Sequence, residues 1–180
     1  MHEQPRLSLF VSFLARDGRL FEQQAGRLRV PAGSAGTWRI RLANVGADIG
    51  SDTVMRLDRF NIQFAGKLQD SHPARRDYVR TTFSGDATVS TDILRGDRGV
   101  RISVHEGTWG DGEILEIFFG DTSGGGPGSE VFWSTTEGRL TLRVENGESL
   151  GPPVVDDARI VVTDTGTVDR LRLLGPTTAK

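Results

Sequence analysis

The sequence contains no cysteine, which excludes disulfide bonds, thiolate metal sites and a cysteine nucleophile from this chain. Because cysteine-free proteins occur on both sides of a membrane, the redox compartment stays open. Only three histidines are present, His2, His72 and His105, and no two of them are spaced as a metal-ligating pair. Lys67 and Lys180 are the only lysines among 22 basic residues, so 20 are arginine, and converging guanidinium groups recognise carboxylates or phosphates.

Neither positive nor negative charge dominates the sequence. The 22 basic and 24 acidic residues give a net charge of −2 and form no blocks, which predicts neither a nucleic-acid surface nor a polybasic membrane patch. No apolar run approaches the roughly 20 residues of a membrane-spanning helix. With 180 residues, 36% of them hydrophobic, the chain is expected to form one domain over residues 1–180. Residues 1–6 are expected to fray, and residues 175–180 are a candidate linker to a following domain.

The segment LSLFVSFLA, residues 7–15, has two interpretations. It resembles the apolar region of a secretory signal, but only Arg6 precedes it, and Phe13 occupies a cleavage position that requires a small residue. Its alternation instead favours a strand that is buried on one face and partly covered on the other. We therefore expect a first strand here, and a cytoplasmic location for want of a convincing signal.

Apolar residues repeat with a period of two along most of the chain. The segments GTWRIRLANVG, GVRISVHEG and GRLTLRVENG each place apolar side chains on one face and polar ones on the other. Asn146-Gly147 is a hairpin dipeptide. Further strands are expected over residues 54–64, 78–83, 87–93, 114–119, 131–135, 158–163 and 168–174. A change of phase predicts a bulge near Asp58 and Arg59. About ten short strands and no helical stripe predict an all-β fold, an antiparallel β-sandwich.

The segment FFGDTSGGGPGSEVFW, residues 118–133, contains four glycines between positions 124 and 128. No Walker lysine follows, and the chain continues into an apolar strand instead of a helix, so nucleotide-binding loops are excluded. A loop between two strands fits best, because glycine permits positive φ and Pro127 stiffens the exit. The alternative is an anion-binding nest formed by Ser123, Gly124, Gly125 and Gly126.

The segment EGTWGDGEILEIFFGDTSGGGPG, residues 106–128, resembles the N-terminal β domain of a family of large uncharacterised bacterial proteins. In that family a GDxSGGxPG loop follows a similar strand, and AGTWRIRL at residues 35–42 is similar to its AGxxGTWxxxY strand. The closing VDRLRLLGPTTAK is similar to a link into an immunoglobulin-like domain. The resemblance, over residues 35–180, implies a downstream metal-dependent hydrolase domain of the PHP (polymerase and histidinol phosphatase) type. The histidine and carboxylate ligands of that domain have no counterpart in this sequence.

Residues with reactive side chains are scattered along the sequence. His105, Asp111 and Asp121 are weak candidates for a metal site, if the loops beside the strand at 114–119 meet. Ser123 between glycines, with His105 as base, is a candidate nucleophile for a small hydrolase, although the GxSxG spacing is missing. We expect neither a metal nor another cofactor.

Three aromatic residues are candidates for ligand binding. Trp109 lies in the turn EGTWGDGE and is expected to be the most exposed ring, whereas Trp38 follows the inward alternation of its strand. Phe132 and Trp133 must face opposite sides of one strand, so at least one is exposed or covered by another domain. A sugar or apolar ligand would stack on such rings.

These observations predict a non-catalytic accessory or interaction domain. Its expected partner is a following immunoglobulin-like or hydrolase domain, or a separate subunit, of a larger metal-dependent hydrolase. The alternatives are a stand-alone ligand- or carbohydrate-binding module and, less favoured, a hydrolase that uses Ser123 and His105.

Overall fold

A computed structural model describes residues 6–60, 67–96, 99–131, 136–147, 149–154 and 158–163. This part of the chain is all-β, with 15 strands and no helix. The strands are β1 (Leu7–Ala15), β2 (Leu20–Glu22), β3 (Arg27–Pro31), β4 (Ala35–Asn44), β5 (Ile49–Gly50), β6 (Val54–Phe60), β7 (Val79–Phe83), β8 (Thr88–Ile93), β9 (Gly99–Glu106), β10 (Thr108–Trp109), β11 (Ile114–Phe119), β12 (Ser129–Glu130), β13 (Thr136–Asn146), β14 (Ser149–Pro153) and β15 (Ala158–Thr163). Within these ranges no helix is long and apolar enough to cross a membrane.

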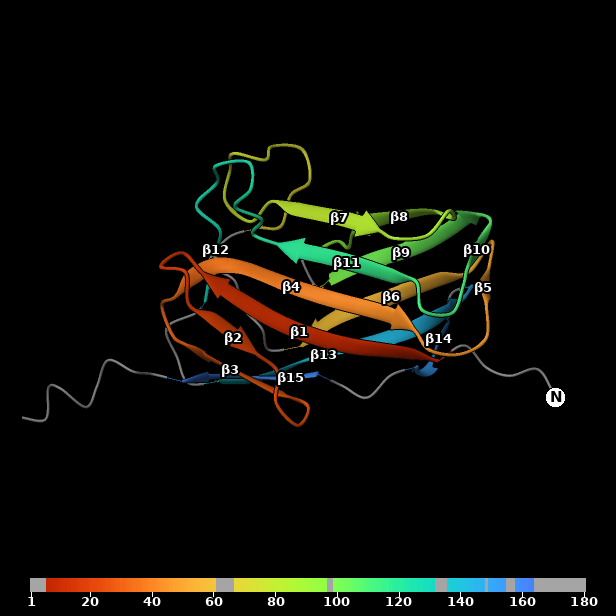
Figure 1. The fold of residues 1–180 in the computed structure, drawn as a ribbon, viewed down its shortest axis with the longest axis horizontal. Coiled ribbons are helices and arrows are strands. Elements are labelled where there is room, and N and C mark those ends of the chain that lie inside the picture. The colour runs from red at the N-terminus through yellow and green to blue at the C-terminus, as the bar shows by residue number, and fades with distance from the viewer. Residues whose placement is uncertain are drawn as a thin grey trace, which may run out of the picture.

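The strands form two main sheets, one in front of the other in Figure 1. Sheet A is antiparallel, in the order β2-β1-β4-β11-β7, with β12 paired to β4. Sheet B follows the order β3-β15-β13-β6-β9-β8, with β14 paired to β13, and curls into a half-barrel. The short strands β5 and β10 pair with each other. All pairs are antiparallel except β3 with β15, so sheet B is mixed.

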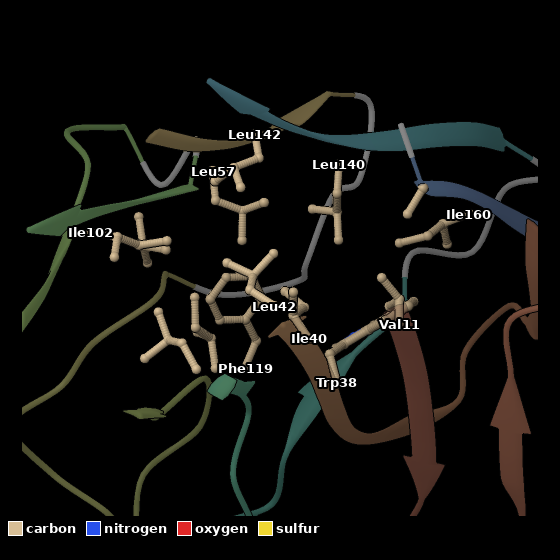
Figure 2. Close-up of a cluster of buried hydrophobic side chains, with 14 of the residues drawn as sticks. Val11, Trp38, Ile40, Leu42, Leu57, Ile102, Phe119, Leu140, Leu142 and Ile160 are labelled. Atoms are coloured by element: carbon tan, nitrogen blue, oxygen red, sulfur yellow. The ribbon is translucent and has the colours of Figure 1, made fainter. Parts of the chain in front are cut away.

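The space between the two sheets is filled by one hydrophobic core. In β4 the inward residues Trp38, Ile40 and Leu42 are at most 1% exposed, while Arg39 and Arg41 alternate with them on the outer face. Side chains from β1, β4 and β11 of sheet A point toward those of β6, β9, β13 and β15 of sheet B (Figure 2). The alternation of polar and apolar residues therefore gives each sheet one face that is exposed to solvent and one face that is buried in the core.

The expected all-β fold is confirmed, and so are the first strand at residues 7–15 and the turn at Asn146-Gly147. The latter joins β13 and β14 with Gly147 at φ 64°. The wholly antiparallel arrangement is corrected, because β3 lies parallel to β15. The chain turns between Gln24 and Arg27 and passes from the edge of sheet A to the edge of sheet B, where β3 runs in the same direction as β15.

The predicted bulge at Asp58 and Arg59 is wrong. Strand β6 keeps an unbroken register from Met55 to Phe60 against β13, so Arg59 takes an inward position in the normal alternation. The structure places register shifts elsewhere, between Thr88 and Val89 and between Arg143 and Glu145. The last four residues of the strand predicted at 54–64, the last four of the strand predicted at 131–135, and the whole strand predicted at 168–174 lie outside the described residues.

Candidate functional site

The glycine-rich loop connects β11 to β12, as the sequence predicts. Its glycines allow a close approach of backbones, since a Cβ at Gly126 would lie 2.9 Å from the carbonyl oxygens of both Pro73 and Arg75. At Gly128, where φ is 85°, a Cβ would lie 2.7 Å from the carbonyl oxygen of Gly36. The loop therefore packs against residues 73–75 and the start of β4.

A buried carboxylate holds the beginning of this loop. Asp121 is 4% exposed and accepts hydrogen bonds from the Ser123 hydroxyl (2.6 Å), from the Ser123 N–H (3.2 Å) and from the Arg80 guanidinium. Burial alone would raise the pKa of Asp121, but the hydrogen bonds from Ser123 and Arg80 outweigh it and hold the pKa below its ordinary value. The carboxylate of Asp121 thus occupies the Ser123 N–H, one of the donors expected for an anion nest.

Beside Asp121, the outer face of sheet A carries an aromatic ring between two guanidinium groups. Phe118, Arg39 and Arg80 lie in one row across β11, β4 and β7. The Arg80 guanidinium carbon is 4.1 Å from the centre of the Phe118 ring and that of Arg39 is 6.0 Å away. Arg39 also forms an ion pair of 2.5 Å with Glu116. Stacking and ion pairs hold these arginines in place on the sheet.

Trp109 is not an exposed ring, and this prediction is wrong. The side chain is 0% exposed, donates its indole N–H to the Glu113 carbonyl (2.9 Å) and packs edge-on against Phe83, with ring centres 5.5 Å apart. The residue belongs to β10, which pairs with β5, and the turn that follows brings the Glu113 carbonyl back to the indole N–H. Trp109 is a core residue in this structure, whereas the inward placement of Trp38 is confirmed.

The structure does not bring the candidate catalytic residues together. Ser123 follows Phe119, which pairs with Trp38 near the start of β4. His105 follows Val104, and the Val104 carbonyl accepts the Asp52 N–H near the opposite end of the sheets. In Figure 1 the loop after β11 and the end of β9 lie on opposite sides of the molecule. Each side chain has another partner: Ser123 donates to Asp121, and the His105 ring bonds the Ser90 hydroxyl at 2.7 Å.

Asp111 is exposed in the turn before β11. Among the described residues, no group of three or more His, Asp or Glu side chains is arranged to hold a metal ion. Phe132 and Trp133 lie outside the described residues, so their proposed role in binding stays a prediction.

Sequence reasoning missed an apolar surface on the outer face of sheet A. It consists of Phe10, Leu14 and Leu20, which are 39%, 47% and 57% exposed. Leu14 and Leu20 are direct partners across β1 and β2, and Phe10 faces the same side four residues earlier on β1. The sequence did carry a signal for this surface, because every second outward position of LSLFVSFLA is apolar.

No known protein-family model matches the sequence, and no curated protein is significantly similar to it.

Proposed function

We propose that the chain is a non-catalytic accessory domain with a β-sandwich fold, which binds a larger metal-dependent hydrolase. The partner surface belongs to a following immunoglobulin-like or hydrolase domain of the same protein, or to a separate subunit. The sequence resemblance suggests this setting, and the apolar surface formed by Phe10, Leu14 and Leu20 is the observation that carries the interaction role.

The apolar surface has the composition of a protein interface. Covering large exposed apolar side chains with a partner lowers the free energy by about 25 cal/mol for each Å² of apolar surface buried. Arginines adjoin the surface, since Arg41 lies opposite Phe10 and Arg39 lies opposite Ser12 in the register of β1 and β4. Interface cores are enriched in aromatic residues and arginine and depleted in lysine.

The other two functions have less support from the geometry. A ligand-binding module would need an exposed ring at Trp109, which is buried. A hydrolase would need Ser123 and His105 in contact, but these residues lie at opposite ends of the sheets. Hydrolysis by the isolated chain that disappears in Ser123→Ala would overturn the accessory role.

Hydroxyl-radical footprinting tests the interaction directly. The isolated 180-residue chain is compared with the native gene product purified from its source cells, whose intact mass is measured in parallel. We expect a longer product or a stable complex, with Phe10, Leu14 and Leu20 labelled much less than in the isolated chain. Val45, which is 54% exposed elsewhere, serves as an internal control and should be labelled equally in both samples.

Two double variants distinguish binding at this surface from nonspecific hydrophobic adsorption. Leu14→Asn with Leu20→Asn should release the partner, while Val45→Asn with Leu150→Asn should retain it. Equal labelling of the apolar surface in both samples, or equal retention by both variants, contradicts the proposal.

A further inference from the structure

The outer face of sheet B carries arginines in rows that cross the strands. Two sets of three arginines lie directly opposite one another: Arg27, Arg159 and Arg139 across β3, β15 and β13, and Arg143, Arg56 and Arg101 across β13, β6 and β9. Neighbouring strands are about 4.8 Å apart, so each row places the Cα atoms of three arginines within about 10 Å. We call these the arginine rows.

Such a register works against the stability of the isolated sheet. Like charges at directly opposite positions destabilise a strand pair, typically by a few tenths of a kcal/mol to about 1 kcal/mol. Arginine cannot lose its charge at any physiological pH, so the repulsion is relieved only by anions. Since each row contains two such neighbouring pairs, the arrangement favours an anionic partner over bare solvent.

The sheet itself supplies part of the required negative charge. Three ion pairs neutralise one arginine each: Arg56 with Asp58 at 2.6 Å, Arg101 with Glu145 at 3.0 Å and Arg159 with Glu137 at 3.7 Å. These contacts leave Arg27 and Arg143, each at one end of a row, without an ion pair in the described part of the chain.

Three outward arginines have no ion-pair partner within the described residues. Arg27 and Arg29 are exposed on β3, and Arg143 is half-buried on β13. The Nε atom of Arg143 is buried without a hydrogen-bond partner in the described part of the chain. A buried guanidinium N–H without an acceptor costs free energy, so Arg143 is not stabilised by a partner of its own in the described part of the chain.

We propose that the arginine rows, with Arg29, dock an acidic protein surface whose carboxylates reach Arg27, Arg29 and Arg143. The ion pairs with Asp58, Glu137 and Glu145 show that carboxylates are the anions that these arginines already bind, which favours an acidic protein surface over a nucleic acid. This inference goes beyond the proposed function, since it assigns a second surface on the other sheet.

Fluorescence anisotropy with labelled poly-L-glutamate tests the proposal, with a DNA duplex of equal charge as the competing polyanion. The informative variant combines Arg27→Ser, Arg29→Ser and Arg143→Ser, which breaks no ion pair in the described structure. The matched control combines Arg16→Ser, Arg75→Ser and Arg95→Ser, three exposed arginines outside the arginine rows with the same change in net charge.

We expect wild type and control to bind poly-L-glutamate alike, in a salt-dependent manner, and the informative variant to bind about tenfold more weakly. Poly-L-glutamate should also raise the melting temperature of wild type but not that of the variant, which must remain folded by circular dichroism. Equal weakening in both triple variants, tighter binding of DNA, or no binding at low salt would overturn the proposal. The Leu14→Asn, Leu20→Asn variant should bind poly-L-glutamate normally, so the two surfaces are judged separately.

Discussion

The two ends of sheet A are closed by loops in chemically different ways. At the end near β5 and β10, the neutral side chains of Asn44 and Trp109 lie in the core. Asn44 donates to the carbonyls of Ala47 (3.1 Å) and Trp109 (2.8 Å) and accepts the Gly46 N–H (3.2 Å). At the other end, the glycine-rich loop is held by the charged pair of Asp121 and Arg80.

This difference shows how the degree of burial decides whether neutral or charged side chains hold a loop in place. The neutral end excludes water completely at the Trp109 ring, where an unpaired charge would be costly. At the charged end Arg80 keeps a side chain that is 35% exposed, so the ion pair retains part of its hydration. We therefore expect the neutral end to depend on packing and the charged end to depend on pH.

The largest effect is expected from Trp109→Ala at the neutral end. Removing a fully buried ring that also forms an indole hydrogen bond should lower the free energy of unfolding by about 3–5 kcal/mol. Urea denaturation measures the change, with Leu150→Ala as a control at an exposed apolar residue, where the effect should stay within about 0.5 kcal/mol. A small effect of Trp109→Ala would mean that the ring does not belong to the core.

Gly128→Ala should be strongly destabilising at the charged end. Both Gly128 and Gly112 have positive φ, 85° and 77°, but only at Gly128 would a Cβ meet backbone atoms within 3 Å. Alanine in the left-handed region costs about 1–2 kcal/mol, which Gly112→Ala should show alone. The clash with Gly36 should bring Gly128→Ala to about 2–4 kcal/mol. Equal melting temperatures for the two variants would contradict the close packing of the glycine-rich loop.

Asn44→Ala removes three hydrogen bonds from the neutral end and leaves two carbonyls without this donor. We expect a loss of about 1–3 kcal/mol, equal at pH 7 and at pH 4, because neither the amide nor its backbone partners titrate. Chemical denaturation at both pH values checks this, and a loss that changes with pH would break the contrast between the two ends.

Asp121→Asn should cost a comparable or smaller amount at pH 7, about 1–2 kcal/mol, but with a different pH profile. The folded state lowers the pKa of Asp121 from 3.8, so the carboxylate contributes stability that is fully present above this value. That contribution is lost as the pH falls below 3.8 and through the pKa of the folded state. The difference in unfolding free energy between wild type and Asp121→Asn should therefore be constant from pH 7 to pH 5 and shrink below pH 4. A constant difference down to pH 3 would contradict the role of the charge.

Regular alternation made much of the scaffold predictable. The period of two in GTWRIRLANVG correctly placed Trp38, Ile40 and Leu42 in the core, and Asn146-Gly147 correctly marked a hairpin. The short strands β2, β3, β5, β10, β12 and β14 escaped prediction, because two to five residues carry too little periodicity. Exposure in turns was harder still: Trp109 lies between glycines in the sequence, and only contact with Phe83 and Glu113 shows that it is buried.

By itself, the sequence determined the all-β class, the faces of the long strands and the loop character of residues 120–128, since these follow from local periodicity and backbone freedom. Only the tertiary structure decided which strands are neighbours, and hence the parallel pairing of β3 with β15 and the alignment of arginines into rows. It also separated Ser123 from His105 and joined Asp121 to Arg80. The physical reason is that cross-strand register depends on contacts between residues far apart in the chain, which no local pattern encodes.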